Sequence, residues 1–283
     1  MSLLANYPGH EGWLDFLRRI RAGVKRDELG LIAAGVAFYT MLAVFPGLAA
    51  LISLWGLIAD PAQVTVFMEQ FAHLLPEDAY SLLHKQAADI AGRPKEALTM
   101  SLAVSVFFAF FSASAGVKAL MKGLNIVYGE RETRGVVKLN LVGLGLTLFL
   151  MAAAMACLAI ILAVPDLLRL FLPGFFVAIW EWARWVLLFF AAIAILATLY
   201  RFAPCCHRPR WKWMDAGSLL ATILWLPASA LFSLYVTHYG SYNETYGSIG
   251  AVIVLLVWLW LGALAVLLGA ELNAGIERKG TSS

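Results

Sequence analysis

Six long apolar stretches set the architecture of this chain of 283 residues. A helix that crosses the hydrocarbon core of a bilayer needs about 20 apolar residues, because lipid offers no hydrogen-bond partner to exposed backbone groups. The stretches that reach this length are Gly30 to Ala59, Leu98 to Val117, Leu139 to Val164, Trp185 to Phe202, Met214 to Thr237 and Ser248 to Ala270. They predict an all-α membrane protein, a bundle of six transmembrane helices.

Composition points the same way. Hydrophobic residues make up 61% of the chain and charged residues 14%, whereas a soluble domain carries about 25% charged residues. The net charge of +3 is small and scattered, so the sequence offers no footprint for nucleic acid.

The lysine and arginine residues divide the connections into two sides. Cytoplasmic flanks carry the excess of these residues. Sixteen lie in the N-terminal arm, in the connections after the second and fourth stretches and in the C-terminal tail, and five lie in the other connections. We therefore predict a multi-pass protein of the bacterial inner membrane with both termini in the cytoplasm.

Three regions are expected along the chain. Residues 1–29 form a cytoplasmic arm, residues 30–275 the transmembrane domain and residues 276–283 a cytoplasmic tail. In the arm, apolar residues recur at helical spacing from Trp13 to Val24 beside a basic face, which predicts an amphipathic helix that lies on the membrane or packs against the bundle. Within the second region, residues 60–97 carry two more helical patterns and predict a small periplasmic helical segment that covers the bundle, meets a partner or lies in the outer leaflet.

The interiors of the predicted spans contain no charged side chain. Ion-coupled transporters and proton pumps keep ionisable groups at mid-membrane, so this pattern disfavours proton-relay chemistry. Small and hydroxylated residues are plentiful instead, and they allow either close helix packing or a weakly polar groove. Pro46 and Pro227 each remove a backbone hydrogen bond and predict a kink or break in their spans.

Glu271 lies near the C-terminal end of the sixth stretch. A carboxylate opposes the helix dipole at that end, so it requires a cationic partner. We expect an ion pair with one of four residues, namely Lys118, Lys122, Arg134 or Arg201.

No pattern typical of a catalytic site is present in the sequence. The five histidines are dispersed and have no metal-site spacing, and Cys205, Cys206 and His207 lack a second ligand pair. We expect no catalytic residues, no metal ligands, no cofactor and no enzymatic activity.

Three blocks resemble the YihY/BrkB family of bacterial inner-membrane proteins, once labelled ribonuclease BN. They are the stretch from Tyr242 to Ala251 with its continuation to Ala274, the block from Ser112 to Arg134, and the block from Ala33 to Pro46. Phe38 stands where the family often has tyrosine, and Phe110 and Phe111 stand where it often has tryptophan. The resemblance implies six spans with cytoplasmic ends and a link to envelope integrity, serum resistance or the transport of lipids and other amphiphiles.

The leading hypothesis is a non-enzymatic protein that transports or translocates a lipid or amphiphilic solute. The alternative is a scaffold that docks an envelope-assembly partner, and ribonuclease activity is disfavoured. Membrane lipids are the expected partners, with an envelope protein or a second copy of the chain as further candidates. The residues expected to line a substrate path or to pack the bundle are Phe38, Tyr39, Pro46, Ser112, Ser114, Asn125, Arg134, Tyr242, Asn243, Tyr246, Glu271 and Asn273.

Overall fold

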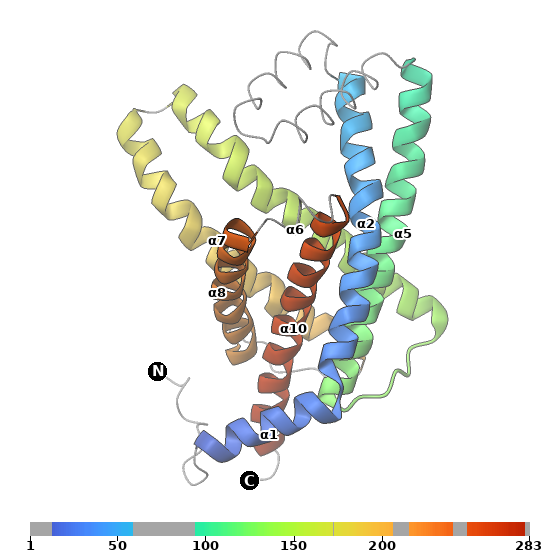
Figure 1. Ribbon diagram of the computed structural model, residues 1–283, viewed down its shortest axis with the longest axis vertical. Helices are drawn as coiled ribbons and strands as arrows, with labels where there is room; N and C mark the ends of the chain where they lie inside the picture. Colours follow the sequence, from blue (N-terminus) through green and yellow to red (C-terminus); the bar gives the residue numbers. More distant parts are fainter. Residues whose placement is uncertain (1–12, 59–93, 172, 206–214, 240–247, 281–283) are drawn as a thin grey trace. The chain divides into compact units, whose positions relative to one another are not determined.

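The computed structural model describes residues 13–58, 94–171, 173–205, 215–239 and 248–280, and within them all regular structure is helical (Figure 1). Six of the helices are long and apolar enough to cross a membrane, which confirms the predicted fold class. The helices are α1 (Trp13–Arg26), α2 (Leu29–Ile58), α5 (Lys95–Tyr128), α6 (Val136–Phe171), α7 (Gly174–Phe202), α8 (Ala216–Tyr239) and α10 (Ser248–Gly280).

Several helices extend beyond the apolar stretches that predict them. α5 continues past Val117 to Tyr128, α7 begins at Gly174 rather than at Trp185, and α10 runs past Ala270 to Gly280. The spans were bounded by hydropathy, whereas a helix ends where its backbone hydrogen bonds end. α5 ends at Tyr128, and the next residue, Gly129, has a φ of +72° that suits a residue without a side chain.

The prolines do not break the helices that contain them. α2 continues through Pro46, α8 through Pro227 and α6 through Pro165. Of the kink or break predicted at Pro46 and Pro227, the break is therefore wrong. A proline removes one hydrogen bond from the ladder. A full break would expose several backbone groups to lipid, which costs more.

The described residues fall into two compact units. Unit 1 consists of the chain up to Phe38 together with the chain from Ser114 onward, and unit 2 runs from Tyr39 to Ala113. In unit 2 the later part of α2 meets the earlier part of α5 through a hydrogen bond of 3.0 Å between the hydroxyls of Ser53 and Ser101.

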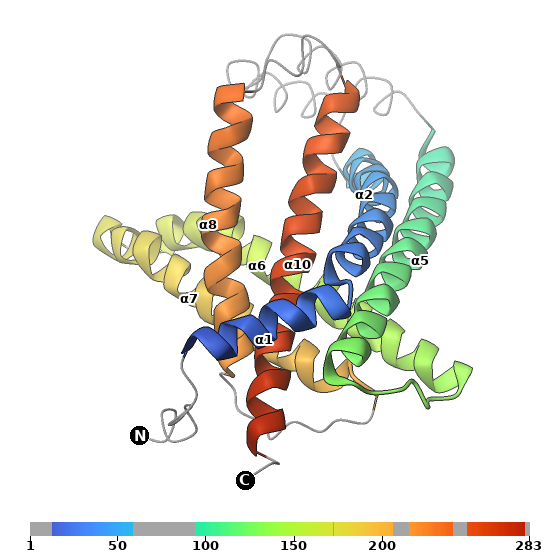
Figure 2. The same cartoon turned by 60° about the horizontal axis from the view of Figure 1, so that its bottom comes forward.

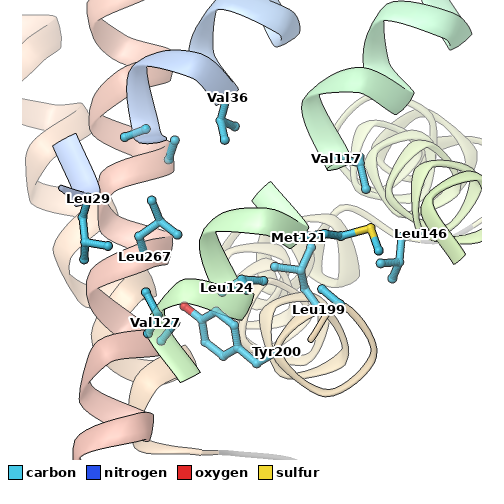
Figure 3. Close-up of a cluster of buried hydrophobic side chains, with 14 of the residues drawn as sticks. Leu29, Val36, Val117, Met121, Leu124, Val127, Leu146, Leu199, Tyr200 and Leu267 are labelled. Carbon is cyan, nitrogen blue, oxygen red and sulfur yellow. The ribbon is translucent and has the colours of Figure 1, made fainter. Parts of the chain in front are cut away.

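In unit 1, α8 packs along α10 and α6 along α7, while α1 crosses α10 (Figures 1 and 2). We use "α1 end" for the end of unit 1 where α1, the first turns of α2, α6 and α8, and the last turns of α5, α7 and α10 lie. The main hydrophobic core gathers there. Figure 3 shows Met121, Leu124, Leu199, Tyr200 and Leu267 meeting from three different helices.

The arm and the tail can be compared with the structure in part. α1 confirms the predicted amphipathic helix, and two residues separate its end from the start of α2. α10 continues through residues 276–280, so this part of the predicted tail is helical. The predicted periplasmic segment lies outside the described residues except for its last four positions, where Pro94 precedes α5.

Candidate functional site

Arg134 is the centre of a polar cluster at the α1 end. Its side chain is only 6% exposed, and its Nε and Nη2 atoms donate to the two carboxylate oxygens of Glu132 at 2.8 and 3.0 Å. The same Nη2 donates to the carbonyl oxygen of Ala203, at the end of α7, at 2.8 Å. One guanidinium thus joins the loop after α5 to the end of α7.

Asn125 and Cys205 complete this cluster. The Asn125 side-chain amide donates to Glu132 at 2.8 Å, and its oxygen accepts from the backbone N–H of Cys205 at 2.8 Å. The Cys205 thiol lies 3.2 Å from the hydroxyl of Thr133. We call Asn125, Glu132, Thr133, Arg134 and Cys205 the Arg134 cluster.

The local sequence explains why the loop returns to α5. Gly129 takes a left-handed backbone conformation, and the next N–H, that of Glu130, donates to the carbonyl of Asn125 at 2.8 Å. This is the hydrogen-bond pattern of a glycine-terminated helix. It turns the chain back so that Glu132 reaches the Asn125 side chain.

The electrostatics of the cluster favour charged forms. The hydrogen bonds from the Arg134 guanidinium lower the pKa of Glu132 to about 2. In return, the hydrogen bond to Glu132 raises the pKa of Arg134. Because the charges of Arg134 and Glu132 are paired with each other, the cluster is better suited to a structural role than to binding a further ion.

Glu271 is the second polar feature of the α1 end. It is 3% exposed, and its carboxylate lies against Gly23 of α1 so closely that a methyl group at Gly23 would overlap it. The nearby cation on α1 is Arg26, whose pKa is raised first by its hydrogen bond to Asp27 and further by the charge of Glu271. Two of the four partners expected from the sequence are engaged elsewhere, since Arg134 binds Glu132 and Lys118 donates to Asn140 at 2.8 Å.

Asn273 fastens the start of α8 to α10. Its side-chain oxygen accepts from the backbone N–H of Gly217 at 2.7 Å, and both residues are buried. Gly217 and Gly269 pack backbone against backbone, so that a side chain at either position would strike a carbonyl oxygen of the other helix. Tyr200 of α7 adds a hydrogen bond of 2.6 Å from its hydroxyl to the carbonyl of Val266.

The remaining sequence-predicted residues are dispersed. Ser114 is buried on α5, Ser112 is partly buried within unit 2, and Pro46 is partly buried on α2. Phe38 and Tyr39 are 53% and 40% exposed. Tyr242, Asn243 and Tyr246 lie outside the described residues.

Comparison with known proteins gives a family at this point. The family model described as virulence factor BrkB matches residues 20–283. The chain belongs to the BrkB family. A ribonuclease-like protein of Bacillus subtilis, YfkH, is 27% identical over 272 residues, which cover 94% of this chain and 96% of that relative. A UPF0761 membrane protein of Vibrio cholerae is 27% identical over 274 residues, covering 94% of this chain and 88% of that relative. No solved structure matches the chain.

Family membership and six candidate spans make this BrkB chain a multi-pass membrane protein. Its structure brings together Asn125 and Arg134 through their common partner Glu132. Glu271 and Asn273 instead contact different helices, α1 and α8. Sequence reasoning missed Glu132, Gly23 and Gly217. Glu132 had a usable signal in the sequence, because an acid two residues before an arginine in a charged loop is a ready partner for it. The glycines matter only through tertiary contacts.

Proposed function

We propose that this BrkB-family protein transports or translocates a lipid or another amphiphile in the bacterial inner membrane, without catalysing a chemical reaction. Support comes first from charge. Residues 31–58, 97–117, 141–165, 185–200, 216–239 and 248–270 contain no aspartate, glutamate, lysine or arginine. Ion-coupled transport across a bilayer normally requires such groups at depth.

The polar groups inside these spans are weak ones. Thr147 and Thr222 are buried and donate to carbonyls of their own helices, and Ser53 bonds Ser101. Ser114 is 4% exposed, and its Oγ has no hydrogen-bond partner among the described residues. This buried hydroxyl in a charge-free span carries the proposal, because it suits the uncharged polar part of an amphiphile better than an ion.

The outward surface of the spans supports the same proposal. On α5, Phe107 is 65% and Phe111 66% exposed, and the two rings stack with centroids 6.4 Å apart. On α7, Trp182 is 82% exposed. Large apolar side chains on this scale suit contact with acyl chains.

Orientation is part of the proposal. Sixteen of the 21 lysine and arginine residues lie in the N-terminal arm, in or beside the connections that follow α5 and α7, or in the C-terminal tail. Because cytoplasmic segments carry the excess of these residues, we assign the α1 end to the cytoplasm. The partners that we propose are membrane lipids, with an envelope protein or a second copy of the chain as additional candidates, and no nucleic acid.

The test is a reconstituted translocation assay. Purified full-length protein in liposomes is expected to move a fluorescent phospholipid analogue between leaflets faster than protein-free liposomes do. Ser114→Ala should lower the rate severalfold, while Thr147→Val serves as the control because its hydroxyl already bonds the carbonyl of Gly143. A rate equal to that of empty liposomes with several phospholipid headgroups would overturn the proposal.

Two other outcomes would redirect it. Because the Bacillus relative is named ribonuclease-like, the same preparation is also incubated with RNA and divalent metal ions. RNA cleavage that persists after the protein is purified again would establish an enzyme. Deletion of residues 61–90 tests a docking role for that segment. Loss of a co-purifying envelope protein from a folded deletion variant would favour a scaffold.

A further inference from the structure

One face of α1 packs against α10, and Gly23 lies in this contact. Gly23 is buried, and the Glu271 carboxylate of α10 fills the space where a side chain would begin. The next residue, Val24, packs on the core of unit 1. The rotation of α1 about its own axis is therefore fixed by contacts.

The opposite face of α1 carries three cations. Arg18, Arg21 and Lys25 are spaced three and four residues apart, which places them on one side of a helix. Arg21 and Lys25 each lie two positions from Gly23, and a rotation of about 100° per residue turns them away from α10. All three residues are exposed. We call them the α1 basic stripe.

Arg26 does not belong to this stripe. Its guanidinium donates to both carboxylate oxygens of Asp27 at 2.7 and 2.9 Å, so its charge is balanced locally. The stripe is thus a separate surface and not part of the contact between α1 and α10.

The depth of α1 relative to the membrane-spanning helices determines which anions can bind the α1 basic stripe. Only Asp27 and Glu28 separate α1 from Leu29, the first residue of a candidate span. Glu271, which seats α1, lies within the span of α10 that ends at Glu277. A helix tied in this way to the ends of two spans lies at the level of the lipid headgroups.

We propose that the α1 basic stripe binds anionic phospholipid headgroups of the leaflet at the α1 end. The guanidinium groups of Arg18 and Arg21 and the ammonium group of Lys25 are complementary in charge to lipid phosphates. The contacts of α1 with α10 and with the core of unit 1 keep these groups at the membrane surface. This proposal does not depend on lipid translocation. It concerns lipids that are held at the surface of the bundle.

The experiment titrates purified full-length protein in detergent with phosphatidylglycerol or phosphatidylcholine and counts bound lipids by native mass spectrometry. Each basic residue near an anionic surface strengthens binding about fivefold. The variant R18Q/R21Q/K25Q should therefore bind phosphatidylglycerol up to about 100-fold more weakly, with phosphatidylcholine binding unchanged. Raising the salt concentration should weaken the wild-type interaction in the same direction.

The matched control removes three other cations near the same end. Lys122, Arg131 and Lys138 are exposed, and K122Q/R131Q/K138Q makes the same change of net charge. Equal losses in the two triple variants would overturn the assignment to α1, as would equal wild-type binding of the two lipids.

A charge-preserving variant guards against a folding defect. R18K/R21K/K25R keeps all three charges and should keep binding of phosphatidylglycerol within about threefold of wild type. Loss of binding in this variant would overturn the proposal. Displacement of bound phosphatidylglycerol by a lower concentration of an acidic peptide such as polyglutamate would instead assign the stripe to an acidic protein.

Discussion

At the scale of single residues, Arg134 owes its effect to the shape of its head group. A guanidinium presents several N–H donors in a planar fork, which lets one side chain bind a carboxylate through two atoms and a backbone carbonyl as well. Glu132 and the carbonyl of Ala203 use this geometry in full. A lysine carries the same charge but cannot reproduce the fork.

Replacing Arg134 by Gln should therefore destabilise the α1 end by about 2 kcal/mol, because Glu132 and Ala203 would lose charge-assisted hydrogen bonds from a guanidinium whose side chain is only 6% exposed. R134K should recover only part of this loss. Thermal unfolding of the purified protein in detergent measures the effect. The control is R131Q, which removes an exposed arginine three residues away, and equal melting temperatures for R134Q and R131Q would show that the cluster adds no stability.

The pKa of Glu132 gives this cluster a pH dependence whose sign is fixed. The carboxyl has a folded pKa of about 2, below its ordinary value of 4.5. Its contribution to stability is therefore complete above about pH 4.5 and is lost as the pH falls toward 2. The difference in unfolding temperature between wild type and E132Q should shrink steadily as the pH is lowered from 5 to 2.5. A difference that stays constant over this range would contradict the low pKa.

At the scale of elements, the pairing of α8 with α10 depends on glycine. Gly217 and Gly269 let the two backbones approach so closely that neither position has room for a side chain. At this point the side-chain oxygen of Asn273 accepts a hydrogen bond from the N–H of Gly217. Close approach of this kind is a common way for helices to associate in lipid, where apolar side chains gain nothing by leaving the solvent.

Gly217→Val should separate α8 from α10, since the new side chain would overlap the carbonyl of Gly269 and the Asn273 amide. We expect a loss of at least about 2 kcal/mol of stability. Gly145→Ala is the matched control, because Gly145 is helical and exposed with no atom within 4 Å of the added carbon, and it should change stability by no more than about 1 kcal/mol. If both variants unfold at the wild-type temperature, the glycine contact is not what joins the helices.

Hydropathy predicted the existence of the six spans and of α1, because length and periodicity follow directly from the solvent that a helix faces. It did not predict their ends. α5 continues from Val117 to Tyr128 because Gly129 ends the helix, whereas the apolar run stops at Lys118. Of the kink or break predicted at Pro46 and Pro227, the break does not occur, because one missing hydrogen bond costs less than an open backbone in lipid.

Sequence reasoning could identify residues of the candidate site only where a residue type by itself requires a partner. A carboxylate at the end of a span requires compensation, so Glu271 could be singled out, and it is indeed buried. The sequence could not reveal that Gly23 would receive it, because that contact joins residues that are far apart in the chain. Asn125 and Arg134 were recognised as motif residues, but their common partner Glu132 depends on the turn at Gly129.

At the scale of the whole molecule, charge and apolar surface are segregated. Residues 31–58, 97–117, 141–165, 185–200, 216–239 and 248–270 hold no aspartate, glutamate, lysine or arginine. Exposed basic residues such as Lys122, Arg131 and Lys138 instead lie in or beside the connections at the α1 end. Lysine and arginine resist transfer across the membrane during insertion, so such an excess marks the side that stays in the cytoplasm. The proposed orientation therefore rests on the distribution of charge and not on any single contact.

Labelling of single cysteines tests this orientation. In a background with Cys157, Cys205 and Cys206 replaced by Ser, Lys138→Cys places a thiol in the first turn of α6 at the α1 end, and Phe175→Cys places one in the first turn of α7, after the helix of α6 has been traversed. Both positions are exposed, Val137 beside the first at 74% and Phe175 at 70%. A membrane-impermeant maleimide should label K138C only in inverted vesicles and F175C only in intact spheroplasts. The reverse pattern would place the α1 end in the periplasm, and the α1 basic stripe would then face the opposite leaflet.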